Sequence, residues 1–212
     1  MRGWAHLEAS GLLHRAGLFL ALGVGLVSLS AALAGLVGKL AAARRLSLAG
    51  LAGLWLLQPV LVGAVLLRWV EVGHEPWQTL YEVLLLCSAF LALSCLGVRL
   101  ALREFRRGSI GSALFDLFTA VSAVFAAGLL FYGAGKDDSA ATLPPALRSA
   151  WMAPHVVAYV FAYAALFIAC AGVVTWWLVA GWSKIRPGAI SQDTRRWLAD
   201  FDRCAYAIVA VG

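Results

Sequence analysis

One histidine stands where a polar segment of the chain meets a long apolar run. His155 follows a proline, and Tyr159 and Tyr163 follow it at four-residue intervals, which places all three on one face of a helix. A neutral imidazole nitrogen is a good ligand for haem iron. The pattern therefore indicates an axial ligand that is reachable from the water side. The alternative is that His155 bonds only a backbone group or a lipid headgroup.

A second group of polar residues runs from His74 to Glu82, with the sequence HEPWQTLYE. Pro76 suits the first turn of a helix, where its missing N–H costs nothing. We interpret Gln78, Thr79 and Glu82 as caps of that helix that interact with its dipole. The alternative is that Glu82 faces the interior of a helix bundle and pairs with another side chain there. The sequence assigns no role to His74.

Composition shows what kind of chain must position these residues. Of its 212 residues, 62% are hydrophobic and 13% are charged, whereas soluble domains average about 45–50% and about 25%. The formal charge of +6 comes from basic clusters between apolar runs, not from one patch, which argues against a nucleic-acid partner. The four cysteines form no C-x-x-C pair and are interpreted as small buried hydrophobes.

Five apolar segments are long enough to cross a hydrocarbon core of about 30 Å at about 1.5 Å per residue. They are residues 16–38, 46–70, 78–102, 110–133 and 153–180. A sixth apolar run, residues 201–212, reaches only about 18 Å, so we expect the chain to end inside a membrane helix. The predicted fold is an all-α, polytopic helical membrane protein with five complete transmembrane helices plus the start of a sixth. It forms a single domain over residues 1–212.

Several polar residues near the ends of these segments carry separate predictions. His6 and His14 precede the first segment and should be solvated or interfacial. Pro59 should kink the second segment, and Gln58 could bond a backbone group freed by the kink. Arg68 should reach out to the far membrane interface.

The loops predict the orientation of the chain, because lysine and arginine concentrate in cytoplasmic loops. The first, third and fifth connections hold the basic clusters, whereas the second has none and the fourth has few. The clustered residues are Lys39, Arg44, Arg45, Arg99, Arg103, Arg106, Arg107, Lys184, Arg186, Arg195 and Arg196. We therefore expect His74 and His155 on the outer side of the membrane.

Residues 145–156, P-A-L-R-S-A-W-M-A-P-H-V, resemble the cytochrome c assembly family, in particular the CcsA/ResC type of the system II pathway. That family carries a P-A-L-x-S-x-W-L-x-x-H-V stretch before a membrane helix and an H-x-P-x-x-N-L-Y-E-S stretch upstream. The segment from His74 to Val83 matches the second stretch in part, with Thr79 in place of asparagine and Val83 in place of serine. The resemblance covers roughly residues 72–212.

The resemblance implies a function in cytochrome c biogenesis. It implies that His155 is the first of two external histidines that ligate a transient b-type haem at the outer membrane face. The haem passes to apocytochrome c, where its vinyl groups form thioethers with the cysteines of a C-x-x-C-H motif. The family acts in the bacterial inner membrane as part of a cytochrome c haem lyase or synthase, with a second, CcsB/ResB-like membrane subunit.

The family's other haem-site parts lie beyond the residues of this chain. They are a tryptophan-rich external segment, the second external histidine and a transmembrane histidine; no histidine is expected inside a complete span here. We therefore expect His155 to supply one ligand of a larger site. The alternative function is a non-haem multi-pass transporter or a structural membrane subunit, with Glu82 and Asp116 as pathway residues. No internal repeat supports a transporter, and Asp116 is better interpreted as a structural carboxylate at the interface.

Overall fold

The computed structural model describes residues 4–101, 109–136, 151–185 and 203. This part of the chain contains five long helices and no strand. The helices are α1 (Trp4–Leu36), α2 (Leu40–Val72), α3 (Leu80–Ala101), α4 (Ser109–Ala134) and α5 (Met152–Ile185). Each contains a segment long and apolar enough to cross a membrane, which confirms the predicted polytopic helical fold. Apart from residue 203, the sixth apolar run lies outside the described residues.

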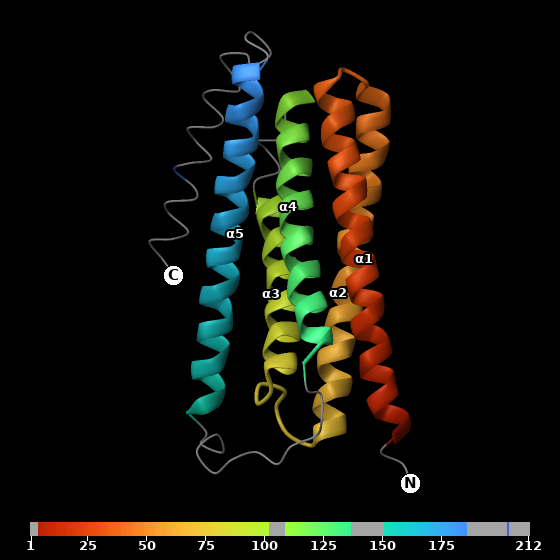
Figure 1. Cartoon of the computed structure of the whole chain (residues 1–212), viewed down its shortest axis with the longest axis vertical. Coiled ribbons are helices and arrows are strands. Elements are labelled where there is room, and N and C mark those ends of the chain that lie inside the picture. Colours follow the sequence, from red (N-terminus) through yellow and green to blue (C-terminus); the bar gives the residue numbers. More distant parts are fainter. Residues whose placement is uncertain (1–3, 102–108, 137–150, 186–202, 204–212) are drawn as a thin grey trace.

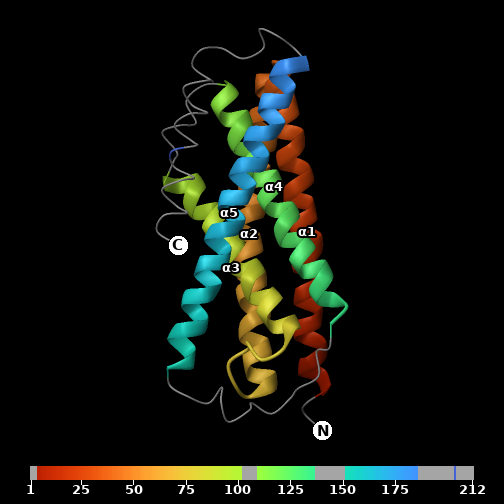
Figure 2. The same cartoon turned by 60° about the vertical axis from the view of Figure 1, so that its left-hand side comes forward.

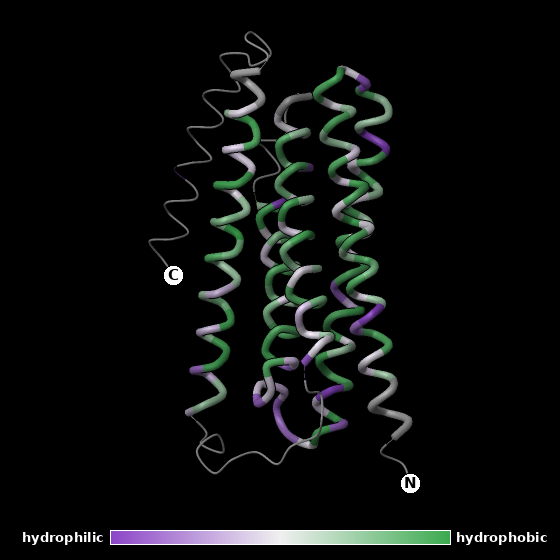
Figure 3. Tube along the Cα trace, viewed as in Figure 1, coloured by the Kyte–Doolittle hydropathy of each residue, from purple (hydrophilic) through white to green (hydrophobic). Residues whose placement is uncertain are grey.

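The five helices form one elongated bundle in which successive helices run in opposite directions (Figures 1 and 2). Helix α1 packs against α2 and α4, α3 packs against α2 and α4, and α5 packs against α3 and α4. The helix directions bring His74 and His155 to one end of the bundle, which we call the histidine end. Arg44 and Arg45 lie near the opposite end, which we call the basic end. Figure 3 shows that the helices are mostly hydrophobic between these two ends.

The first two helices are longer than the predicted apolar segments. Helix α1 begins at Trp4 and not at residue 16, because the polar residues before the apolar run include no proline to stop a helix. Helix α2 begins at Leu40, so Arg44 and Arg45, which were predicted to lie in a loop, belong to its first turns. The bounds of α3, α4 and α5 follow the predicted segments more closely.

Two glycines make the tight turns at opposite ends of α2. Gly38 has φ 83° between α1 and α2, and Gly73 has φ 72° immediately after α2. The Gly73 N–H donates to the carbonyl oxygen of Trp69 at 3.0 Å, which closes the last turn of the helix. Only glycine adopts this left-handed backbone without steric cost. The second turn starts the short connection that carries His74.

Close contact between α1 and α2 depends on small residues. A Cβ atom added at Gly53 would lie 2.8 Å from Cγ2 of Val24, and one added at Gly17 would lie 2.7 Å from Cδ2 of Leu61. Leu57 and Leu61 are fully buried in this region. In a membrane, close backbone approach and van der Waals packing replace much of the hydrophobic drive that joins helices in water.

Candidate functional site

His155 lies in the first turn of α5, and its side chain is exposed. Its ring meets the ring of Tyr159 edge to face, with 4.5 Å between centroids and 90° between planes. Tyr159 in turn stacks beside Tyr163 at 6.3 Å and 25°. Tyr159 and Tyr163 are about half exposed, at 51% and 49%. The structure thus confirms that the three residues share one helix face, and the imidazole of His155 is exposed.

His74 lies in the connection between α2 and α3, at the same end of the bundle as His155. Its side chain is half-buried, and its Nδ1 atom lies 2.9 Å from the carbonyl oxygen of Glu75. If Nδ1 carries the proton and donates it to this carbonyl, the second ring nitrogen keeps a lone pair. Among the described residues there is no group of three or more His, Cys, Asp or Glu side chains that could hold a metal ion. The described part of the histidine end therefore offers single imidazoles and no metal cluster.

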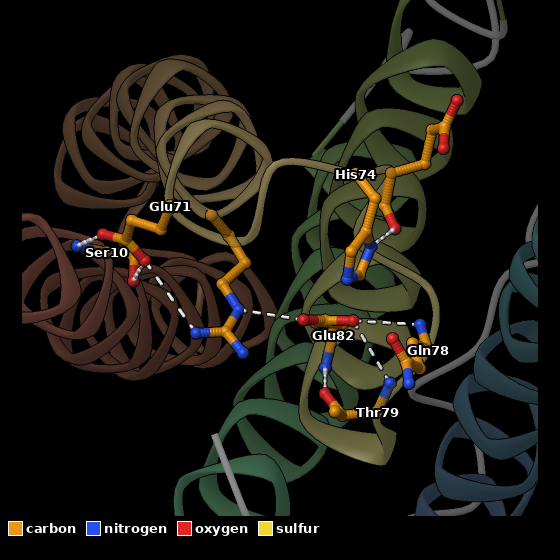
Figure 4. Close-up of polar contacts among 8 residues, drawn as sticks. Ser10, Glu71, His74, Gln78, Thr79 and Glu82 are labelled. Atoms are coloured by element: carbon orange, nitrogen blue, oxygen red, sulfur yellow. Dashed lines mark hydrogen bonds and ion pairs between the residues drawn. The ribbon is translucent and has the colours of Figure 1, made fainter. Parts of the chain in front are cut away.

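Glu82 serves both roles that the sequence left open. Its Oε2 accepts the backbone N–H of Gln78 at 2.9 Å and of Thr79 at 3.1 Å, and its own N–H donates to Thr79 Oγ1 at 3.3 Å. This reciprocal arrangement is a capping box at the start of α3. Its Oε1 accepts a hydrogen bond from Arg68 Nε at 2.9 Å (Figure 4). Glu82 therefore caps α3 and also joins it to α2.

Arg68 does not reach out to the interface as predicted. Its side chain is 1% exposed and lies between Glu82, at 2.9 Å, and Glu71, whose Oε2 is 3.9 Å from Arg68 Nη1. The guanidinium also lies 5.4 Å from the ring centroid of Tyr81. Ser10 of α1 donates to Glu71 through its hydroxyl at 2.6 Å and its N–H at 3.2 Å. The prediction was wrong because acceptors on two helices lie within reach of Arg68 inside the bundle.

His14 was also predicted wrongly, since it is 2% exposed and not solvated. It lies within the membrane-spanning part of α1, where no histidine was expected. Its Nε2 lies 2.8 Å from the Leu130 carbonyl oxygen of α4, and its ring stacks on Tyr81 at 4.9 Å. Helical periodicity could have revealed it, because His14 belongs to a buried stripe of α1. That stripe is Ser10, His14, Gly17, Ala21 and Val24. The side chain of His6 lies outside the described ones.

A second buried polar cluster lies toward the basic end of the bundle. Asp116 of α4 accepts from Arg99 Nη1 of α3 at 3.2 Å and from Ser47 Oγ of α2 at 2.8 Å. Arg99 also donates to Thr119 Oγ1 at 2.6 Å. Asp116 is 1% exposed, which fits its predicted structural role. The partner Arg99 was predicted only as part of a basic connection.

Gln58 and the cysteines complete the list of predicted polar positions. Helix α2 continues through Pro59, and Nε2 of Gln58 is buried without a hydrogen-bond partner among the described residues. Cys87 and Cys95 are buried as expected, whereas Cys170 is exposed on α5. Cys204 lies outside the described residues.

Fold and site together define a polytopic helical membrane protein with an exposed histidine at one end. About half of the chain is similar to proteins named cytochrome c biogenesis protein CcsA. The relative from Prochlorococcus marinus (strain NATL2A) is 37% identical over 108 residues, which are 51% of this chain and 32% of the relative. The relative from Phalaenopsis aphrodite subsp. formosana is 33% identical over 107 residues, which are 50% of this chain and 31% of the relative. The relative from Gossypium hirsutum is 34% identical over 107 residues, which are 50% of this chain and 32% of the relative.

These relatives confirm the resemblance to CcsA-type proteins for about half of the chain. The chain spans about a third of the length of the curated relatives it matches. No protein-family model and no solved structure matches the chain.

Proposed function

We propose that this protein takes part in cytochrome c biogenesis, where it binds haem through His155 for covalent attachment to apocytochrome c. The observation that carries the proposal is the 33–37% identity to CcsA proteins over about half of the chain. The exposed position of His155 at the start of a membrane-spanning helix supports it. An imidazole in this position can approach a ligand from the water side while its helix stays fixed in the bundle.

The residues of α5 fit one side of a haem site. His155 would bind the iron, and the perpendicular contact with Tyr159 limits rotation of the imidazole. The half-exposed ring of Tyr163 extends the aromatic surface along the same face. When bound, the haem supplies the vinyl groups that accept the cysteine thiols of the apocytochrome. The contribution of this chain is proximity and orientation, because one fixed imidazole holds the reactive edge of the porphyrin in place.

The proposal also includes an orientation of the chain in the membrane, a second haem ligand and a partner subunit. The basic clusters favour an orientation with the basic end of the bundle in the bacterial cytoplasm and His155 on the outer side of the inner membrane. We propose that a second histidine ligand is provided outside the described residues, and that a CcsB/ResB-like membrane subunit completes the haem lyase or synthase.

The test is haem retention by the full chain purified from membranes. Residues 1–212 alone should bind haem weakly, because they supply one ligand of the site. With the second histidine ligand supplied, we expect the unchanged protein to carry haem and His155→Ala to lower its haem content at least tenfold, a factor that corresponds to about 1.4 kcal/mol of binding free energy. Added imidazole should restore the absorption spectrum in the variant. Leu178→Ala, an exposed position toward the other end of α5, is the matched control. Equal haem content in His155→Ala and Leu178→Ala would contradict the proposal.

The transporter alternative loses its main support in this structure. Glu82 and Asp116, the proposed pathway residues, are each paired with an arginine at 2.9 Å and 3.2 Å. Both also accept hydrogen bonds from neighbouring groups. Such contacts give each carboxylate a structural role within the bundle.

A further inference from the structure

The connection between α2 and α3 is short and carries His74, but few of its own backbone groups bond one another. Between Gly73 and Thr79, one such bond is described, from Trp77 N–H to the Glu75 carbonyl oxygen at 3.0 Å. A segment of this kind keeps one conformation only if side chains from neighbouring helices hold it. We call residues 73–79 the His74 loop.

Glu82 holds the end of the His74 loop that enters α3. One of its carboxylate oxygens accepts the N–H groups of both Gln78 and Thr79. Its other oxygen accepts from Arg68 Nε of α2 at 2.9 Å. Figure 4 shows Glu82 between these two sets of donors, with His74 above it on the same side of α3. A single carboxylate therefore ties the loop to the helix before it as well as to the helix after it.

Arg68 extends this tie to α1. Its guanidinium lies near Glu71, and Glu71 accepts two hydrogen bonds from Ser10. Arg68 and Glu82 are each 1% exposed. Each charge is therefore stabilised by the other side chain and not by hydration. The result is a continuous set of polar contacts from α1 through α2 to the His74 loop.

We infer that Arg68 and Glu82 are positioning residues that clamp the His74 loop at the histidine end of the bundle. The inference rests on the proposed function in one respect: the clamp gives the haem bound at His155 a fixed neighbouring surface at the same end. Neither residue needs to touch the haem. Their effect is exerted through the conformation of the loop.

The bundle supplies a matched control for a general loss of stability. Arg99 and Asp116 form a second ion pair of similar burial, at 3.2 Å, but toward the basic end. Arg68→Met removes the arginine partner of Glu82 and the weaker contact with Glu71, and Arg99→Met removes the arginine partner of Asp116. Glu82→Gln is the milder variant. The amide oxygen of the new glutamine can still accept the N–H groups of Gln78 and Thr79, whereas its NH₂ group cannot accept a hydrogen bond from Arg68.

The experiment measures amide hydrogen exchange in the full chain, together with the spectrum of bound haem. We expect Arg68→Met and Glu82→Gln to speed exchange in residues 73–79 at least about tenfold. We expect both to shift the electron paramagnetic resonance signature of the haem. Arg99→Met should lower the thermal stability but leave loop exchange and the haem signature as in the unchanged protein. If Arg68→Met does not fold, Glu82→Gln alone tests whether the clamp holds the His74 loop.

Two outcomes would overturn the inference. One is wild-type protection of the loop in Glu82→Gln, and the other is an equal increase of loop exchange in Arg99→Met. An unchanged haem signature in a variant whose loop exchanges faster would remove the link to the haem site. Absence of haem from the unchanged protein when the second histidine ligand is supplied would instead contradict the proposed function, while the exchange result would still decide whether the clamp exists.

Discussion

At the scale of single residues, the described part of the bundle contains two arginines that are nearly inaccessible to solvent. Arg68 and Arg99 are each 1% exposed, and each meets a carboxylate from another helix. Removal of an arginine from water into a helix bundle costs several kcal/mol unless its donors find acceptors. Each arginine therefore constrains how its helix packs on its neighbours.

Asp116 provides a prediction at this scale. Asp116→Leu should lower the free energy of unfolding by about 3–5 kcal/mol, because it leaves the charge of Arg99 buried without its carboxylate. The double variant Arg99→Met/Asp116→Leu should recover most of that loss, since two apolar side chains then face each other. Unfolding in detergent measures both values. A double variant as unstable as Asp116→Leu alone would show that the ion pair is not the cause.

At the scale of helices, local sequence and neighbouring helices decide different features. The Thr79–Glu82 capping box and the glycines at 38 and 73 set where helices begin and end. The separation of α1 from α2 depends instead on which residues meet across the contact. Gly53 meets Val24 there, and a β-branched valine in a helix has essentially one rotamer available.

Gly53 therefore provides a prediction for the α1–α2 contact. Gly53→Ala would place Cβ 2.8 Å from Cγ2 of Val24, so the two helices must move apart. The expected cost is about 1–3 kcal/mol of unfolding free energy, as for other overpacked contacts. Gly23→Ala is the control, because a Cβ there meets nothing within 4 Å. A similar stability for the two variants in the same detergent would contradict the prediction.

At the scale of the whole molecule, alternating helix directions separate the two ends by the length of the bundle. By the bounds of the helices, His74, His155, Arg68 and Glu82 belong to one end, and the Arg99–Asp116 pair lies toward the other. Among the described residues, the two buried arginine–carboxylate pairs therefore have different neighbours. Only the cluster at the histidine end lies at the same end of the bundle as His155.

The proposed orientation can be tested by labelling of single cysteines in whole cells. In a background without the native cysteines, an impermeant thiol reagent should modify Trp151→Cys, whose position is 84% exposed near His155. It should not modify Ala42→Cys, which is exposed at the basic end. Permeabilised cells provide the control, since both variants should then react. Labelling of Ala42→Cys alone in intact cells would reverse the proposed orientation.

The sequence alone determined the membrane fold, since the five apolar segments satisfy the length and hydrophobicity that a bilayer demands. It also determined the shared face of His155, Tyr159 and Tyr163, because helical spacing within one element is local information. The resemblance to CcsA proteins depended on short motifs that can be seen without any fold. Together these observations predicted the class of protein and the candidate ligand.

Only the tertiary structure decided how the polar residues pair. The sequence predicted Arg68 at the interface and His14 as solvated or interfacial, yet both lie inside the bundle. Their partners, Glu82 and the Leu130 carbonyl group, belong to other helices. Whether a charged side chain extends to the membrane surface or turns inward depends on acceptors that distant segments bring within about 3 Å. Hydropathy and periodicity describe one helix at a time, so they contain no information about those acceptors.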